Sequence, residues 1–434
     1  MRLPALRRLP GAVLALAVLA PLAAGAAFTA ADAPAAAAPA VQPDPAPVPM
    51  TTAGTGDFRL RWRNDDRREA AALRRAVNGS DDRVRLGTLL DTQQGRRQAR
   101  HKCTQATRSG SVLHGFNRTS TDWWCLPRSN AASTDWTPQG ISSTEDSRQQ
   151  GTVNGRKAFV FSWHSGGVGK SGLGTRLSFL DPRNGRYMHV LLVEPRPDGN
   201  GRMSYTNLTT HAGGVAWYLN YLFVADTRGG LHVFDMHYLL DLANGSAGST
   251  QETNRVGLYG DTYYARGYSF ALPRIGTWAN QGDALYDFAS VDRSSPDPEI
   301  LTGEWCNLSR PNASCRVGRV ARWRASDLTD FVGTNPFSGT ARARSAYHLP
   351  TPYTQGAVSW NGCYNTDKGG AGSRPLLITT RPGRTALRTQ RGALGLQDLT
   401  LYRSTNRLWT VTEHPDTDNR VRRVLYGVPR RSCP

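Results

Sequence analysis

The sequence predicts an all-β fold, and three features point to it. Residues 211–235 hold three short runs in which apolar side chains alternate with other residues, separated by Asn220 and by Gly229-Gly230. Such alternation is typical of half-buried antiparallel strands. Helical periodicity is scarce after residue 136, whereas Gly, Thr, Tyr and Trp are frequent there. Similar stretches recur downstream, and because a short meander is not stable alone, we expect it to be one unit of a larger β structure.

The N-terminus has the pattern of a secretory signal peptide. Three arginines precede an apolar run over residues 12–27, and residues 1–33 are therefore expected to be removed on export. A membrane anchor is the alternative, but the run is short for a transmembrane helix, so we expect no membrane span after signal removal. Residues 34–56 are rich in Ala and Pro and are expected to form a disordered linker. The sequence thus predicts a secreted, extracellular protein.

Residues 57–135 are expected to be an N-terminal extension of helices and loops. Residues 67–77 have the composition of a short helix that ends at Asn78-Gly79, and a second helical turn is expected toward Leu90. Trp123-Trp124-Cys125 lies in a loop-like stretch and is expected to anchor the extension onto the main body.

Residues 136–434 contain repeated units, which predict a β-propeller. The openings of four units resemble one another: Gln-Gly-Ile-Ser at 139–142, Gly-Gly-Val-Ala at 213–216, Gln-Gly-Ala-Val at 355–358 and Gln-Asp-Leu-Thr at 397–400. A further unit begins near Asp287. Units of this size hold the strands of one propeller blade. We therefore predict five four-stranded blades, with six as the alternative if a further blade lies in residues 101–135 or after Asp241.

The six cysteines predict disulfide bonds. An even number of cysteines in an exported protein is typical of a disulfide framework. No Cys-x-x-Cys is present, which argues against a thiolate metal site or a redox pair. The pairing is open from sequence alone, and we expect Cys103 with Cys125, Cys306 with Cys315, and Cys363 with Cys433.

The formal net charge is +19, and most of the basic residues are arginine. A strongly cationic exported protein is attracted to polyanions such as acidic polysaccharides and anionic wall polymers. The alternative is that the arginines follow from a GC-rich genome and have no function. We expect an extracellular glycan or polyanion as the partner, no specific recognition of nucleic acid, and a monomer.

Polar residues stand at the start of the innermost strand of each predicted blade. In a propeller these positions surround one mouth of the central channel, where their side chains converge on a ligand. The alternative is a ring of side chains satisfied by water and by one another. The predicted ligand-binding residues are Gln139, His211, Asp287, Gln355, Gln397 and His414.

Three residues are candidates for catalysis at the same mouth. His211 precedes Gly213-Gly214, which allows a ligand to approach the backbone closely, and an imidazole there can act as acid or base. Glu413 and Asp398 supply carboxylates from the last unit. A histidine held inside the channel by hydrogen bonds is the alternative for His211.

Two motifs resemble known propeller families. Pro138-Gln139-Gly140-Ile141 and the Leu-Phe-Val-Ala-Asp-Thr run at 222–227 are similar to blades of NHL-type and gluconolactonase-like propellers. The stretch 136–428 also looks like a family of exported actinobacterial propeller proteins. The resemblance implies the propeller fold and no particular activity. Gluconolactonase-like propellers hold a divalent ion, but Gln139, Gln355 and Gln397 stand where some ligands are expected, and Gln is a poor ligand for a hard cation. We therefore expect no metal site and no cofactor.

Three functions remain open from the sequence. The first is a secreted propeller that binds an extracellular carbohydrate or anionic polymer at the channel mouth. The second is a polysaccharide hydrolase or lyase that uses His211 with Glu413 or Asp398. The third is a scaffold for protein partners.

Overall fold

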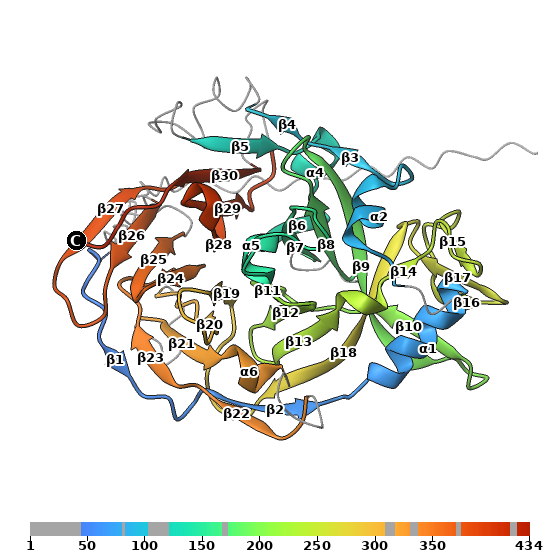
Figure 1. The fold of residues 1–434 in the computed structure, drawn as a ribbon, viewed down its shortest axis with the longest axis horizontal. Coiled ribbons are helices and arrows are strands. Elements are labelled where there is room, and N and C mark those ends of the chain that lie inside the picture. Colours follow the sequence, from blue (N-terminus) through green and yellow to red (C-terminus); the bar gives the residue numbers. More distant parts are fainter. Residues whose placement is uncertain are drawn as a thin grey trace, which may run out of the picture. The chain divides into compact units, whose positions relative to one another are not determined.

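The computed structural model describes residues 45–79, 83–102, 121–166, 172–308, 317–329, 337–369, 375–416 and 423–434. The predicted signal peptide and residues 34–44 of the predicted linker lie outside these residues. Residues 45–56 of that linker are described and contain a short strand at Thr52–Ala53, so the expected disorder does not extend to that strand. All described residues belong to one compact unit, Asp44–Pro434. Strands far outnumber helices in it, which confirms the all-β prediction (Figure 1).

The largest sheet joins two antiparallel groups of four strands through a parallel pairing of β9 with β18. The first group is β6 (Trp136–Ser143), β7 (Phe159–Ser165), β8 (Thr175–Leu180) and β9 (Arg186–Pro197). The second group is β11 (Val215–Tyr218), β12 (Tyr221–Asp226), β13 (Gly230–Asp235) and β18 (Phe270–Asn280). Shorter strands extend the sheet: β2 (Arg59–Arg63), β3 (Arg97–Gln98), β10 (Met203–Asn207), β14 (Leu240–Asp241) and β22 (Thr340–Arg342).

Three further sheets follow in chain order. The first holds β19 (Phe288–Asp292), β20 (Glu299–Gly303), β21 (Arg319–Arg324), β23 (Ser345–His348) and β1 (Thr52–Ala53). The second holds β24 (Ala357–Trp360), β25 (Cys363–Lys368), β26 (Leu376–Thr380) and β27 (Leu387–Arg391). The third holds β28 (Leu396–Tyr402), β29 (Arg407–Thr412), β30 (Val424–Pro429), β5 (Asp122–Cys125) and β4 (Arg100–His101). A small separate sheet is made of β15 (Gly248–Ser249), β16 (Val256–Tyr259) and β17 (Thr262–Ala265).

The first strands of the five groups contact one another in a closed ring, which gives a propeller-like arrangement (Figure 1). β6 contacts β11 and β28, β11 contacts β19, β19 contacts β24, and β24 contacts β28. Glycines allow this close approach: a Cβ added to Gly140 would lie 2.5 Å from the backbone of Gly214 and Val215. The Gly-containing openings predicted from the sequence are therefore the places where neighbouring groups of strands meet backbone to backbone.

The predicted helix at residues 67–77 is confirmed as α1 (Arg67–Asn78). It ends at Gly79, whose φ of 72° is the left-handed conformation that glycine adopts readily. Its buried side chains, including Leu73 and Val77, pack beside β9 and β14. The remaining helices are short: α2 (Leu86–Asp91), α4 (Arg128–Ala131), α5 (Thr144–Ser147), α6 (Ala325–Leu328), and the 3-10 turns η1 (Met236–Tyr238) and η2 (Arg403–Thr405).

Segments near the N-terminus complete three of the sheets. β1 pairs with β23, β2 lies between β18 and β22, and β5 pairs with β30. In β5, Trp123 and Trp124 are both buried, each in a different hydrophobic cluster. The stretch expected to be loops around residues 123–125 is therefore a strand of the sheet that also holds the C-terminal strand.

One of the expected disulfide bonds is confirmed. Cys363 and Cys433 are bonded, which ties the C-terminus to β25. Cys125 and Cys306 are also disulfide-bonded. Their expected partners, Cys103 and Cys315, lie outside the described residues, so those two pairings stay predictions.

Candidate functional site

The residues predicted at the channel mouth are mostly enclosed by the fold. Gln139, Asp287, Gln397 and Asp398 are buried, whereas His211 is exposed. The other three, which are half-buried, are Gln355, Glu413 and His414. Gln139 Nε2 donates a hydrogen bond to Glu413 Oε2 at 3.3 Å, so the structure does bring these two together.

Asp398 is a structural link between innermost strands. Its Oδ2 accepts hydrogen bonds from the backbone amides of Ile141, at 3.1 Å, and Val215, at 3.2 Å. Its Oδ1 accepts from the amide of Leu399 at 2.9 Å. Burial raises the pKa of Asp398 well above its usual range. The carboxyl group thus connects β28 to β6 and β11, and its oxygens are engaged with backbone.

Asp287 is engaged in a similar way. Its two oxygens accept from Thr227 Oγ1 and from the amide of Trp305, each at 2.7 Å. Burial raises the pKa of Asp287 to about 7.

His211 stacks on His164, with ring centroids 5.0 Å apart. Desolvation lowers the pKa of His211, and desolvation together with the nearby His211 lowers that of His164 to about 4. Among the described contacts, no hydrogen bond or ion pair joins His211 to Glu413 or Asp398.

The opposite end of the ring is closed by α5. This four-residue helix follows β6 directly and contacts β6, β11, β19 and β28. Ser143 caps it by accepting from the amide of Glu145 at 3.2 Å. Asp146 is fully enclosed: its Oδ2 accepts from Ser142 Oγ at 2.7 Å and from Thr400 Oγ1 at 2.6 Å. Burial raises the pKa of Asp146 to about 6.

Two arginines hold the backbone of α5 from other sheets. Arg293 donates from Nε to the carbonyl of Asp146, and from Nη2 to that of Ser147 at 2.6 Å. Arg403 donates from Nε to the carbonyl of Glu145 at 3.1 Å. The carbonyls that a short helix leaves unpaired are therefore satisfied by charged donors, as a buried helix end requires.

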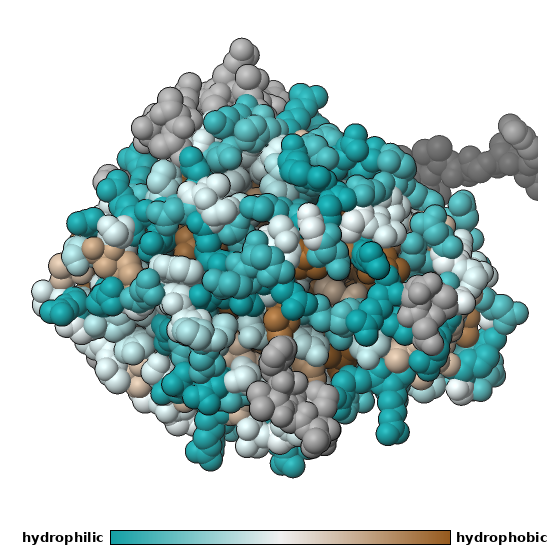
Figure 2. All heavy atoms as spheres, viewed as in Figure 1, coloured by the Kyte–Doolittle hydropathy of each residue, from teal (hydrophilic) through white to brown (hydrophobic). Residues whose placement is uncertain are grey.

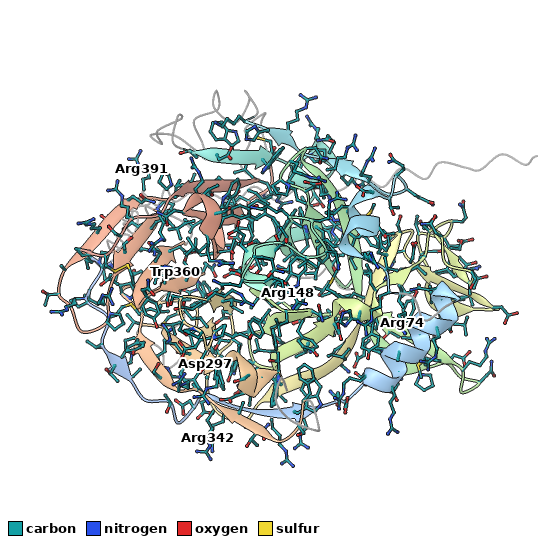
Figure 3. All side chains as sticks on the ribbon, in the orientation of Figure 1. Arg74, Arg148, Asp297, Arg342, Trp360 and Arg391 are labelled. Atoms are coloured by element: carbon teal, nitrogen blue, oxygen red, sulfur yellow. A yellow bond between two sulfur atoms is a disulfide. The ribbon has the colours of Figure 1, made fainter. Side chains whose placement is uncertain are left out.

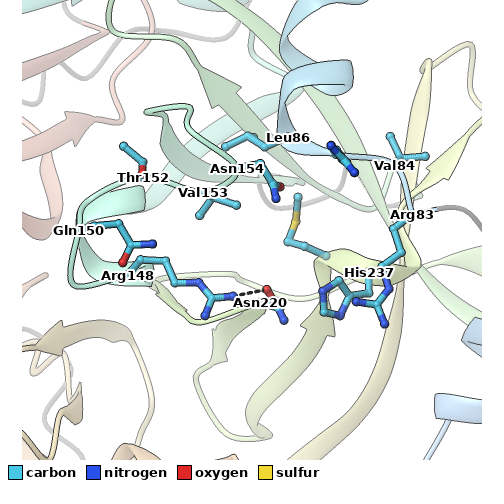
Figure 4. A pocket seen from close by; sticks show the side chains of 12 residues that line it. Arg83, Val84, Leu86, Arg148, Gln150, Thr152, Val153, Asn154, Asn220 and His237 are labelled. Atoms are coloured by element: carbon cyan, nitrogen blue, oxygen red, sulfur yellow. Dashed lines mark hydrogen bonds between the residues drawn. The ribbon is translucent and has the colours of Figure 1, made fainter.

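A pocket of about 970 Å³ opens beside α5. We call it the arginine pocket. Figure 4 shows Arg148, which follows α5, on one side, and Arg83 and His237 on the other. The lining residues are Arg83, Val84, Arg85, Leu86, Arg148, Gln150, Thr152, Val153, Asn154, Asn220, Met236 and His237. Figure 3 places Arg148 toward the middle of the ring of sheets, and Arg342 and Arg391 at its periphery.

The arginine pocket is positively charged. It has three arginines and one histidine, and none of the described lining residues is acidic. Asp81 and Asp82, which precede Arg83 in the sequence, lie outside the described residues. Arg148 Nη2 donates to Asn220 Oδ1 at 2.6 Å, which fixes the guanidinium at the pocket wall (Figure 4).

Local structure explains how these side chains reach one place. The residues Arg83 and Arg85 lie between α1 and α2, and Arg85 is the N-cap of α2. Asn220 sits in the tight turn between β11 and β12. His237 lies in η1, whose N-cap Asp235 accepts from its amide at 2.9 Å. On the face drawn in Figure 2, hydrophobic side chains are recessed among hydrophilic ones.

No residue of this pocket was predicted from the sequence to bind a ligand, and Asn220 was identified only as the break between two strands. The pocket arginines come from segments far apart in the chain, and in a sequence with 53 Lys and Arg no single arginine is conspicuous. The one available signal was the Arg-x-Arg pair at Arg83 and Arg85, directly before the expected second helical turn.

A second pocket of about 770 Å³ lies between the first and last groups of strands. We call it the aromatic pocket. Its floor contains buried aromatic rings and its rim carries arginines. The aromatic rings that line it are Trp124, Phe159, Tyr402 and Trp409.

The described residues show neither a cluster suited to a metal ion nor a helix suited to a membrane. No group of three or more His, Cys, Asp or Glu among them is arranged to hold a metal ion. None of the helices in the described part of the chain has the length and apolar character needed to span a membrane.

Comparisons with known proteins give weak similarities only. No protein-family model and no curated protein sequence matches the chain. Similar solved structures include a gluconolactonase from Xanthomonas campestris, at 13% identity and a TM-score of 0.31, covering 78% of this chain and 86% of that one. Another is a structure of the mitotic checkpoint complex, at 11% identity and a TM-score of 0.30, covering 94% and 99%. A quinohemoprotein alcohol dehydrogenase from Comamonas testosteroni has 10% identity and a TM-score of 0.22, covering 64% and 47%. Similarities at this level carry no argument about activity, so the residues of the site must decide it.

Proposed function

We propose that the protein is a secreted, five-bladed propeller that binds an anionic carbohydrate or anionic polymer outside the cell, and that the arginine pocket is its binding site. The observation that carries this proposal is the convergence of Arg83, Arg85 and Arg148 on one cavity with no acidic side chain among its described lining residues. A guanidinium group binds carboxylate, sulfate or phosphate through paired hydrogen bonds.

The surroundings of the pocket support an anionic ligand of sugar size. A volume of about 970 Å³ lies within the range of pockets that enclose small organic ligands. Apolar side chains, including Val84 and Met236, line part of it, while Asn154 and Gln150 offer amide groups. A carbohydrate has apolar ring faces and hydroxyl groups, and such a mixed lining suits both.

The proposed site lies at the other end of the ring from the mouth predicted by sequence. At that mouth, Asp398 and Asp287 use their oxygens to bind backbone and side-chain donors within the fold. The arginines of the pocket face a cavity instead. For this reason we favour binding over the hydrolase or lyase alternative: Asp398 is engaged with the backbone, Glu413 accepts from Gln139, and no described hydrogen bond or ion pair links either carboxylate to His211.

Secretion is part of the proposal and has independent support. The bond between Cys363 and Cys433 fits an oxidising compartment, and the net charge of +19 favours encounter with polyanions at a cell envelope.

The proposal is tested by calorimetric titration of the protein with polygalacturonate, a carboxylated polysaccharide, and with neutral dextran. We expect binding of polygalacturonate that weakens as salt increases, and no binding of dextran. The variant R83Q/R85Q should bind at least about tenfold more weakly, because each lost charged hydrogen bond is worth about 1.5–3 kcal/mol.

The matched control is R342Q, which removes one exposed arginine from β22, away from the pocket (Figure 3). It should bind as the wild type does. Equal binding by R83Q/R85Q and R342Q, or binding of dextran as tight as that of polygalacturonate, would refute the proposal.

A further inference from the structure

We infer that the arginine pocket and the aromatic pocket are two parts of one extended site, which binds a linear acidic polysaccharide across both. This inference rests on the proposed function and adds to it the length and chemistry of the ligand.

Both pockets lie at the same end of the ring of strands. The arginine pocket borders the segment that follows β6 and the turn after β11. The aromatic pocket is lined by Phe159 at the start of β7, by Tyr402 at the end of β28, and by the turn after β8. Because neighbouring strands in each group are antiparallel, the end of β6 and the start of β7 lie together at one edge.

A chain of contacts joins the linings of the two pockets, and we call the residues of this chain the wall. Asn154 lines the arginine pocket, and Arg156 follows two residues later. Arg156 forms an ion pair with Asp181 at 3.1 Å. Pro182 and Arg183, which follow Asp181 directly, line the aromatic pocket. The Arg156–Asp181 ion pair therefore links the segments that line the two pockets.

The charges on this wall balance. Arg156 pairs with Asp91 at 2.6 Å as well as with Asp181, and Arg183 pairs with Asp181 at 2.6 Å. Two arginines and two aspartates leave the wall without net charge, so an anionic chain that crosses it meets no net repulsion. Attraction comes from Arg83, Arg85 and Arg148 in the arginine pocket and from Arg100 in the aromatic pocket.

The aromatic pocket is suited to a sugar ring that carries an anionic group. Trp124 and Tyr402 are more than nine-tenths buried, so they present a small apolar floor and cannot enclose a flat base on both faces. Such a floor fits the C–H face of a sugar. Arg100 and Arg183 are exposed and line the same pocket. Because Arg183 is paired with Asp181, Arg100 is the arginine that we assign to the anionic group. The acidic Asp122 in this lining is already paired with His101 at 2.5 Å.

A polymer that fills both pockets binds more tightly than two separate fragments, because its two bound segments are covalently linked. Once one segment is bound, the next is held at high effective concentration beside its own pocket, which raises affinity by about 10²–10⁴ in favourable cases. A fragment that fills one pocket has no such gain. The inference therefore predicts a threshold in ligand length.

The experiment titrates the complete mature protein with oligogalacturonides of increasing length, from the disaccharide upward. We expect affinity to rise at least about tenfold once the oligomer spans both pockets. R100Q, in the aromatic pocket, should lower the affinity of long oligomers about tenfold and leave that of the disaccharide unchanged. R85Q should weaken both, and R342Q neither.

The outcomes separate the two proposals. If binding of the disaccharide depends on Arg85 and long oligomers bind no more tightly than the disaccharide, the extended site is wrong and the proposed function stands. If no oligogalacturonide or polygalacturonate binds, the proposed function fails too. If polyphosphate or single-stranded DNA binds as tightly as the long oligomers, with the same loss in R100Q, the assignment to polysaccharide is overturned.

Discussion

Replacing Asp146 with asparagine should stabilise the protein at alkaline pH. Asp146 is buried in α5, and its Oδ2 accepts from two hydroxyl groups, which give weak compensation for a buried negative charge. Burial raises its pKa from 3.8 to about 6. The folded protein therefore keeps a proton that the unfolded chain has lost, and this contribution to stability is present at low pH and lost as the pH rises through about 6.

The size of the effect on stability follows from the pKa of Asp146 in the folded and unfolded states. The raised pKa of Asp146 lowers the free energy of unfolding by about 3 kcal/mol at pH 8 and by about 1 kcal/mol at pH 4.5, relative to an aspartate with the same pKa in both states, because one pKa unit is worth about 1.4 kcal/mol. D146N has no charge to bury at either pH, and the hydroxyl groups of Ser142 and Thr400 can rotate to accept from the new amide. From pH 4.5 to pH 8, we expect the free energy of unfolding to shift in favour of D146N by about 2 kcal/mol.

The assay is urea unfolding of both proteins at pH 4.5 and pH 8 without reductant. Taking the difference between them removes the effect of other buried carboxyl groups such as Asp287. The control is D261N, which makes the same change on a side chain that is 100% exposed, and its difference from wild type should not depend on pH in this way. A gap between D146N and wild type that stays constant or moves the other way would refute the reasoning.

Three further predictions concern stability, each read from urea unfolding at neutral pH. The double variant C363A/C433A removes the disulfide bond between two residues that are 70 positions apart, and its free energy of unfolding should fall by about 4 kcal/mol. A fall under about 1 kcal/mol would show that the bond does little to restrict the unfolded chain. G140A places a methyl group 2.5 Å from the backbone of Gly214 and Val215 and should lose about 3 kcal/mol or fail to fold. The control G199A adds a methyl group in open space and should unfold like wild type. Similar unfolding of the two variants would contradict the packing described. R322Q removes the guanidinium that pairs with Asp292 and Glu299, and Glu299 keeps a longer contact with Arg344 at 3.6 Å; it should lose about 3–5 kcal/mol, while a loss under about 1 kcal/mol would show that the two carboxylates are well solvated.

Local patterns in the sequence were enough to place the innermost strands. Each expected opening, including those at Gly140, Gly214 and Gly356, lies within or directly before a strand of the inner ring. Alternation of apolar residues and the need for glycine at a close approach are properties of a few neighbouring residues, so they can be read without knowing the partner. The same is true of α1 and its end at Gly79.

Pairings between distant segments could not be read in this way. β5 lies beside β30, and nothing in Trp123-Trp124 names that partner. The site has the same difficulty: Arg83, Arg148 and His237 meet only because three separate turns converge. A polar residue at the start of a strand can bind a ligand or, as Asp398 does, the backbone of neighbouring strands. The sequence does not distinguish these two roles.

The pairing of β5 with β30 sets an order of events for folding. β5 is synthesised well before β30, because a long stretch of sequence separates the two strands. The sheet that they share cannot be completed until both strands have been made, and contacts this distant in sequence form slowly. Until β30 pairs with it, the edge of β5 that β30 covers in the folded protein stays open to pairing with other chains.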